Sequence, residues 1–133
     1  MSARHGGEGG VIVNLSSMAA TSGGRPGNAH DAASKAAVDA FSVAFAKEVA
    51  GEGIRVISVR PAFTITDMTR HRLEDAMFRQ VISETILLGR AARVEEVAAP
   101  IAWLLSNEAS FVTGTCLDIS GGGFATADRP RRG

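Results

Sequence analysis

The polar residues of this chain that could do chemistry gather around one strand-to-helix connection. Ser16 and Ser17 follow the apolar run 11–15, and Asp31 and Lys35 lie four residues apart at the start of a long amphipathic segment. The i,i+4 spacing puts the carboxylate and the ammonium on the same face of a helix. A strand, a loop and a helix in this order present polar groups at the carboxyl end of a sheet, where open α/β folds bind ligands.

Purely structural roles are also open to the same residues. Ser16 and Ser17 are common turn residues, and Asp31 is a good N-cap for the helix that follows. An ion pair between Asp31 and Lys35 would stabilise that helix by about 0.3–0.5 kcal/mol. A lysine on a helix is by default a solvated surface residue.

Length and composition describe an ordinary globular chain of one domain. The 133 residues are 45% hydrophobic and 21% charged with no formal net charge, which gives no indication of nucleic-acid binding. Cys116 is the only cysteine, so a reducing compartment is favoured. The longest apolar run, 98–105, is far shorter than the roughly 20 residues of a membrane span, and residues 1–10 lack the apolar core of a secretory signal. We expect a cytoplasmic protein with no membrane and no nucleic-acid partner.

The three histidines, His5, His30 and His71, lack the mutual spacing and the cysteine or carboxylate neighbours of a metal site. We therefore predict no metal.

Alternating strand and helix patterns predict the fold. Apolar and β-branched runs predict strands at 11–15, 54–60 and 115–119, and helical spacing of apolar residues predicts helices at 31–50, 70–81 and 95–106. Long helical crossovers join parallel strands, so the sequence predicts an α/β fold of three parallel strands with flanking helices. Three strands are few for a sheet covered on both faces, which indicates part of a larger sheet. We expect flexible segments at 1–10 and 124–133.

Five short motifs, in this order, resemble the short-chain dehydrogenase/reductase family. They are Val-Asn-Leu-Ser-Ser at 13–17, Ala-Ala-Ser-Lys-Ala-Ala-Val at 32–38, Gly-Ile-Arg-Val-x-x-Val-Arg-Pro at 53–61, Glu-Glu-Val-Ala at 95–98 and Ser-Phe-Val-Thr-Gly at 110–114. The resemblance implies a doubly wound Rossmann sheet that binds NAD or NADP. In the family, the glycine-rich phosphate-binding turn precedes the first strand seen here, and this chain contains no such Gly-x-x-x-Gly-x-Gly turn. Residues 11–123 therefore resemble the carboxyl-terminal half of that domain, a partial Rossmann fold.

The resemblance assigns catalytic roles to two residues of this chain, and it shows that a third catalytic residue of the family is replaced. Ser17 matches the serine that holds the substrate oxygen, and Lys35 matches the lysine that binds the ribose hydroxyls and lowers the pKa of a catalytic tyrosine. That tyrosine should stand at Asp31, and the chain has no tyrosine at all. An aspartate has a reference pKa near 3.9 and holds no proton to donate at neutral pH, and its oxygens stop roughly 3 Å nearer the backbone than a phenol oxygen. The sequence predicts impaired acid–base chemistry.

The family also implies nicotinamide contacts after the second predicted strand. Thr66 matches a threonine that contacts the carboxamide or a nearby phosphate, and Thr64 occupies the position whose backbone meets that amide. Pro61 and Ala62 begin this segment, with Ala62 where the family usually has glycine.

Three functional hypotheses follow from these observations. The chain is a truncated NAD(P)-dependent oxidoreductase for a small alcohol or carbonyl substrate, with little or no activity by itself. Alternatively, it is the catalytic half of a longer active enzyme whose upstream reading frame is missing. A third, non-enzymatic hypothesis is association into a homo-oligomer through the alanine-rich helix that starts at Asp31, as the matching helix does in family oligomers.

Overall fold

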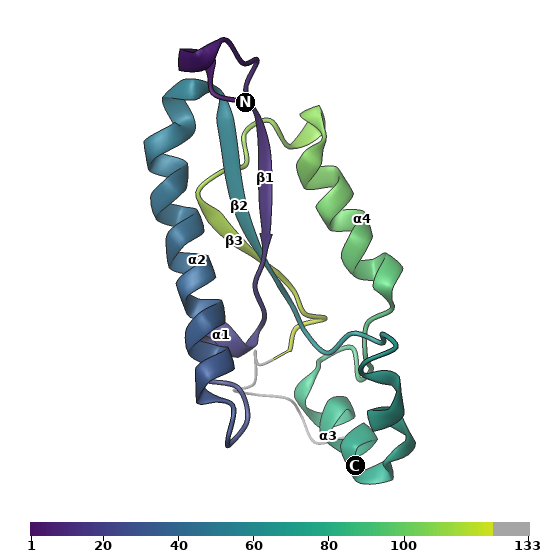
Figure 1. The fold of residues 1–133 in the computed structure, drawn as a ribbon. Helices are drawn as coiled ribbons and strands as arrows, with labels where there is room; N and C mark the ends of the chain where they lie inside the picture. The colour runs from purple at the N-terminus through teal and green to yellow at the C-terminus, as the bar shows by residue number, and fades with distance from the viewer. Residues whose placement is uncertain (124–133) are drawn as a thin grey trace.

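A three-stranded parallel sheet lies at the centre of the computed structural model, which describes residues 1–123. Its strands are β1 (Gly10–Leu15), β2 (Ile54–Pro61) and β3 (Thr115–Ile119), in the order β1-β2-β3. Residues Gly10 to Leu15 pair with Ile54 to Val59, and Ile57 to Pro61 pair with Thr115 to Ile119. The prediction of three parallel strands is confirmed, with β2 in the middle (Figure 1).

Helices cover both faces of this sheet, as a doubly wound fold requires. The long helix α2 (Ala29–Val49) packs on one face and α4 (Val94–Leu105) on the other (Figure 1). The shorter helices are α1 (Ala19–Ser22) and α3 (Ala76–Thr85), and single 3-10 turns lie at η1 (Ala3–His5), η2 (Ala50–Glu52), η3 (Arg70–Glu74) and η4 (Asn107–Ala109). Within residues 1–123, no helix combines the length and apolar character needed to cross a bilayer.

The alternation of side chains along β2 creates two separate cores. Val56 faces α2 and packs in a cluster with Ala46 and Val49, whereas Ile57 and Val59 face α4 and pack with Leu104. Successive residues of a strand point to opposite faces, so one buried strand supplies both clusters. Val56, Ile57, Val59 and Leu104 are fully buried.

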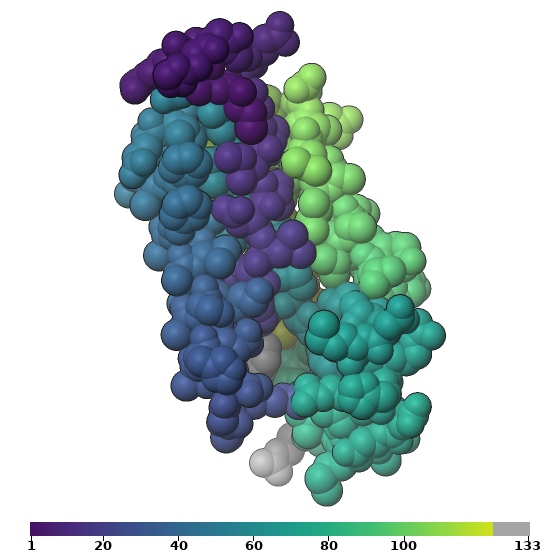
Figure 2. All heavy atoms as spheres, in the orientation of Figure 1, coloured from purple at the N-terminus to yellow at the C-terminus, as the bar shows by residue number. Residues whose placement is uncertain are grey.

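The strand β1 is an edge of the sheet, and its side chains remain visible between α2 and α4 in the space-filling view (Figure 2). Leu15 at its end is 59% exposed. This open edge agrees with the expectation that the sheet is part of a larger one.

Three local predictions differ from the structure. The helix α2 begins at Ala29 with Asn28 as its N-cap, so Asp31 lies in the first turn and the prediction that it is the N-cap is wrong. The predicted helix 70–81 is divided, because Asp75 is extended and its carboxylate accepts a hydrogen bond from the N–H of Met77 at 2.9 Å, which starts α3 anew. The connection between the first predicted strand and the first predicted helix, which the sequence does not assign to a helix, contains α1. The flexible tail predicted for 124–133 lies outside the described residues.

Candidate active site

The carboxyl ends of the three strands meet and are joined by backbone hydrogen bonds. The N–H of Ser16 donates to the carbonyl of Val59 at 2.8 Å, and the N–H of Met18 donates to the carbonyl of Pro61 at 3.1 Å. From the other side, the N–H of Ala62 donates to the carbonyl of Ile119 at 3.2 Å. Because these bonds continue the ladder, the segments that follow β1 and β2 lie side by side.

The structure brings the segments carrying Ser17 and Lys35 together at this end. The buried Ser16 hydroxyl donates to the backbone carbonyl of Lys35 at 3.0 Å, which ties the end of β1 to the second turn of α2. The Ser17 hydroxyl oxygen accepts the N–H of Ala19 at 3.1 Å. An accepting hydroxyl keeps its own proton to donate, so Ser17 can still hold an oxygen of a bound molecule. Lys35 is half-buried.

Asp31 is exposed on the first turn of α2. No ion pair joins its carboxylate to the ammonium of Lys35, although both residues lie in the described part of the chain. Its backbone carbonyl accepts the Ser34 hydroxyl at 2.8 Å. The structure therefore gives Asp31 a place in the exposed start of the helix and leaves the predicted ion pair unformed.

A buried carboxylate that the sequence reasoning missed lies one turn beyond Lys35. Asp39 accepts the Ser58 hydroxyl at 2.5 Å and the Nε–H of Arg60 at 2.7 Å, and Arg60 also contacts Asp118 at 3.3 Å. Burial opposes ionisation of Asp39, but hydrogen bonds from Ser58 and Arg60 outweigh it and hold its pKa below the usual value.

The Asp39 network links α2 to the middle strand. Burial favours the neutral form of Arg60, but the bond to Asp39 outweighs this and raises the pKa of the guanidinium. A sequence signal did exist, since Asp39 is the only charged residue of the stretch 36–46, which is otherwise made of small and apolar residues. The network holds the helix segment that carries Lys35 against the sheet.

The segment after β2 is folded around a threonine that the sequence reasoning also missed. The Thr69 hydroxyl donates to the carbonyl of Thr64 at 2.6 Å and accepts the N–H of Thr66 at 2.8 Å. The Thr64 hydroxyl donates to the carbonyl of Ala62 at 3.0 Å. These bonds hold Ala62, Thr64 and Thr66 in one compact turn directly after Pro61.

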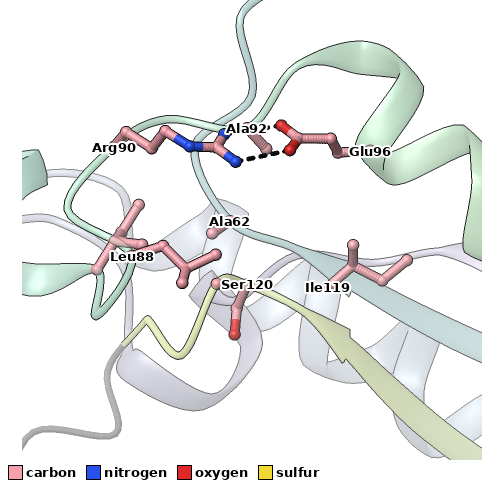
Figure 3. Close-up of a pocket in the computed structure, with 9 residues that line it drawn as sticks. Ala62, Leu88, Arg90, Ala92, Glu96, Ile119 and Ser120 are labelled. Carbon is pink, nitrogen blue, oxygen red and sulfur yellow. Dashed lines mark hydrogen bonds and ion pairs between the residues drawn. The ribbon is translucent and has the colours of Figure 1, made fainter.

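A hollow of about 160 Å³ opens on the α4 side of the strand ends, lined in part by Ala62, Ile119 and Ser120. Figure 3 shows Arg90 and Glu96 joined along one side and Ser120 across from them. The guanidinium of Arg90 donates to both carboxylate oxygens of Glu96 at 2.7 and 2.8 Å. These bonds, with one from the N–H of Arg93, lower the pKa of Glu96 to about 2.

Of the site residues predicted from sequence, Ala62 alone lines this hollow. Among residues 1–123, no three His, Cys, Asp or Glu side chains gather in a way that could hold a metal ion.

Comparisons with known proteins cover nearly the whole described chain. A family profile described as enoyl-(acyl carrier protein) reductase matches residues 2–123. The uncharacterized oxidoreductase YgfF of Escherichia coli strain K12 is 46% identical over 123 residues, which are 92% of this chain and 49% of that protein. The 3-oxoacyl-[acyl-carrier-protein] reductase FabG of Thermotoga maritima is 45% identical over 113 residues, which are 85% of this chain and 45% of that protein.

A solved structure shows the same similarity over most of this chain. A Beutenbergia cavernae protein, proposed to be an NAD(P)-dependent gluconate 5-dehydrogenase and containing NADP at low occupancy, is 37% identical with a TM-score of 0.82. The match covers 92% of this chain and 48% of that one. The chain thus spans about half the length of the relatives that it matches.

Proposed function

This chain belongs to the short-chain dehydrogenase/reductase family, and we propose that it takes part in hydride transfer between NAD or NADP and a small alcohol or carbonyl substrate. The observation that carries the proposal is the hydrogen bond from Ser16 to the carbonyl of Lys35, because it holds Ser17 and Lys35 at one end of the sheet. The NADP bound to the related Beutenbergia protein supports the cofactor class.

Ser17 and Lys35 would take the roles of the matching family residues. The Ser17 hydroxyl can donate its proton to a substrate oxygen while it accepts the N–H of Ala19. The ammonium of Lys35 carries three N–H donors, and no ion pair or side-chain hydrogen bond occupies it within residues 1–123. It is therefore available to the two adjacent hydroxyls of a ribose.

The nicotinamide end of the cofactor fits the turn that follows β2. Ala62 borders an open hollow, and the Thr69 bonds fix the backbone of Thr64 and Thr66 beside it. Pro61 and Ala62 would lie against the nicotinamide ring, with Thr64 and Thr66 at its carboxamide. The bound cofactor supplies or accepts the hydride. The 133 residues contain no glycine-rich turn for the pyrophosphate, so we expect the chain by itself to bind NAD(P) weakly.

Proton transfer is the step that we expect to fail in this chain. Asp31 stands where the family has its acid–base tyrosine, and it is exposed in the first turn of α2. An aspartate is ionised at neutral pH, and its short side chain leaves its oxygens roughly 3 Å behind the position of a phenol oxygen. We propose that the chain by itself has little or no oxidoreductase activity.

Activity assays on matched variants test this proposal. The oxidation of NADH and NADPH is followed with a panel of small carbonyl compounds, for the wild-type chain and for Lys35→Ala. Lys47→Ala is the control, because Lys47 is the only other lysine and lies exposed on the same helix. We expect no turnover that depends on Lys35. Carbonyl reduction that Lys35→Ala abolishes and Lys47→Ala preserves would contradict the proposed lesion at Asp31.

A longer active enzyme is the alternative form of the same function. Its support is that the relatives are about twice as long as this chain. An in-frame Gly-x-x-x-Gly-x-Gly sequence upstream in the coding DNA would favour this form, and a stop codon directly before Met1 would exclude it. In such an extended chain, Asp31→Tyr should raise the carbonyl reduction rate, and the absence of a gain would place the lesion elsewhere.

A non-enzymatic association role is the second candidate, because α2 exposes small and aromatic side chains. Phe41 is 57% exposed and stacks on Phe45, beside the exposed Ala40 and Ala44. We propose that this face forms a homo-oligomer interface. Light scattering should then show a dimer or larger species that Ala40→Glu dissociates, whereas Ala98→Glu on the exposed side of α4 does not. A monomeric wild-type chain would refute this role.

The single cysteine also supports a cytoplasmic location for the protein, which we include in the proposal.

A further inference from the structure

Two arginines from separate segments converge on one aromatic ring near the strand ends. The guanidinium carbon of Arg25, in the loop between α1 and α2, lies 4.5 Å from the centroid of the Phe78 ring. That of Arg72, in η3, lies 5.6 Å from the same centroid. Phe78 is itself held edge-on against Phe63, with the ring centroids 4.9 Å apart. Both guanidinium groups therefore contact one ring, and that ring is itself packed against Phe63.

These two guanidinium groups differ from the others, because within the described residues neither forms an ion pair with a carboxylate or donates a hydrogen bond to a carbonyl oxygen. Every other arginine of residues 1–123 bonds a carboxylate or backbone carbonyls: Arg4, Arg60, Arg70, Arg90 and Arg93 bond carboxylates, and Arg55 and Arg79 bond carbonyls. Burial and the nearby charge of Arg72 together lower the pKa of Arg25, which agrees with two neighbouring cations that have no counter-ion within residues 1–123.

The cation–π contact with Phe78 leaves the N–H groups of both guanidinium groups available for hydrogen bonds. A cation–π contact uses the face of the guanidinium plane, whereas its N–H groups point outward in that plane. Each guanidinium offers the forked donor geometry that carboxylates and phosphates bind in pairs of hydrogen bonds. Two like charges without a counter-ion repel each other. A bound anion would attract both guanidinium groups and would also offset their mutual repulsion.

The pair lies at the same end of the molecule as the proposed active site (Figure 1). Arg25 belongs to the connection that runs from Ser17 to the helix of Lys35, and Phe63 follows Ala62 at the end of β2. In Figure 1 this connection and α3, which carries Phe78, lie at the same end of the molecule. A molecule held by Ser17 could thus extend one end toward the two arginines.

We propose that Arg25 and Arg72 bind an anionic oxygen group, carboxylate or phosphate, on the substrate. This inference rests on the proposed oxidoreductase function, which it narrows to hydroxy or oxo compounds that carry an acidic group at their far end. Phe78 orients the two guanidinium groups, and the anion bridges the α1–α2 loop and η3 through them.

An NMR titration tests the site without any hydride transfer. The Nε–Hε signals of the arginines in the 133-residue chain are followed while succinate or inorganic phosphate is added, with succinamide as the uncharged control. We expect saturable shifts of the Arg25 and Arg72 signals with at least one anion and none with succinamide. Succinate represents a carboxylate substrate and phosphate a phosphorylated one, and the tighter of the two identifies the group.

Matched variants separate a built site from general attraction of anions. Arg25→Gln and Arg72→Gln should each weaken binding about ten-fold, the effect of losing a charge-assisted hydrogen bond. Arg70→Gln is the control, because Arg70 is exposed in the same 3-10 turn but pairs with Asp67. Phe78→Leu should weaken binding while both charges remain. Non-saturable shifts, or an equal loss in Arg70→Gln, would overturn the inference. Unchanged thermal unfolding of the exposed Gln variants verifies the fold.

Failure of the anion site and failure of the proposed oxidoreductase function give different results in the binding and turnover experiments. Anion binding without Lys35-dependent turnover leaves the site established in a chain that lacks activity. Turnover of uncharged carbonyl compounds without anion binding supports the reaction class and refutes the anion site.

Discussion

Replacing the buried Asp39 with alanine should destabilise the chain more than replacing an exposed carboxylate. The side chain accepts hydrogen bonds from Ser58 at 2.5 Å and from Arg60 at 2.7 Å, and the residue is only 7% exposed. Charge-assisted hydrogen bonds contribute about 1.5–3 kcal/mol each, but Arg60 retains Asp118 as a partner. We therefore expect Asp39→Ala to lower the free energy of unfolding by about 2–4 kcal/mol.

Asp118→Ala is the matched control, because it removes the other carboxylate of the same arginine. The Asp118 side chain is 47% exposed and lies 3.3 Å from Arg60, so its loss should cost about 0.2–1 kcal/mol. Urea unfolding at neutral pH measures both variants, and a difference of a few kcal/mol corresponds to a midpoint shift of about 1–2 M. Equal destabilisation by the two variants would refute the assignment of Asp39 as the centre of the network.

The pH dependence of the Asp39 effect has a definite sign. The pKa of Asp39 is lowered in the folded state, so its carboxylate stabilises the fold above the unfolded pKa near 3.9. This contribution is lost as the pH falls through the lower folded value. The gap between the wild type and Asp39→Ala should therefore be complete at neutral pH and shrink below about pH 4. A gap that stays constant down to pH 3 would show that packing, rather than charge, stabilises this position.

Two further predictions concern the Arg90 pair and the glycine turns. A titration of Glu96 followed by carbon-13 NMR should give a pKa of about 2. Arg90→Gln should raise this pKa toward the usual range of a glutamate, since the hydrogen bond from Arg90 is the main cause of the shift. An unchanged midpoint in the variant would contradict this assignment. Gly9→Ala should destabilise the chain clearly more than Gly23→Ala in urea unfolding. Both have φ near +80°, at 84° and 79°. The Cβ added at Gly9 meets the carbonyl of Gly53, whereas the Cβ added at Gly23 meets no atom of residues 1–123 within 4 Å beyond its own chain neighbours. Gly23→Ala should cost about 1–2 kcal/mol from φ alone, and equal losses would refute the steric argument.

The elements of the sheet could be predicted from local sequence, because short buried strands have a composition that few other structures share. The runs 11–15, 54–60 and 115–119 differ from β1, β2 and β3 by at most one residue at an end. The helix boundaries were less predictable. Asp31 has the chemistry of an N-cap, yet α2 starts at Ala29 with Asn28 as its N-cap, and Asn is favoured at that position as strongly as Asp. Asp75 interrupts the predicted helix 70–81 by a capping bond that its sequence neighbours do not reveal.

The candidate site was predictable only where the family motifs carry it. Ser17, Lys35 and the segment from Pro61 to Thr66 follow from motif register, and the roles given to them remain proposals. Thr69 was missed, since its hydroxyl acts on the backbone of Thr64 and Thr66 through the shape of the turn. Asp39 and Arg60 are 21 residues apart in sequence, and they meet because parallel pairing places β2 under α2.

The sequence alone determined the strands, the approximate helices, the family and the absence of a tyrosine beside Lys35, because each of these is a property of neighbouring residues or of composition. Only the tertiary structure decided the order β1-β2-β3, the bond from Ser16 to Lys35 and the approach of Arg25 and Arg72 to Phe78. These depend on strand register and helix docking, which bring distant residues within hydrogen-bonding or ring-contact distance and leave no periodic signal along the chain. The stretch around Lys35 thus carries its family signature locally, while the groups that hold it against the sheet come from elsewhere in the fold.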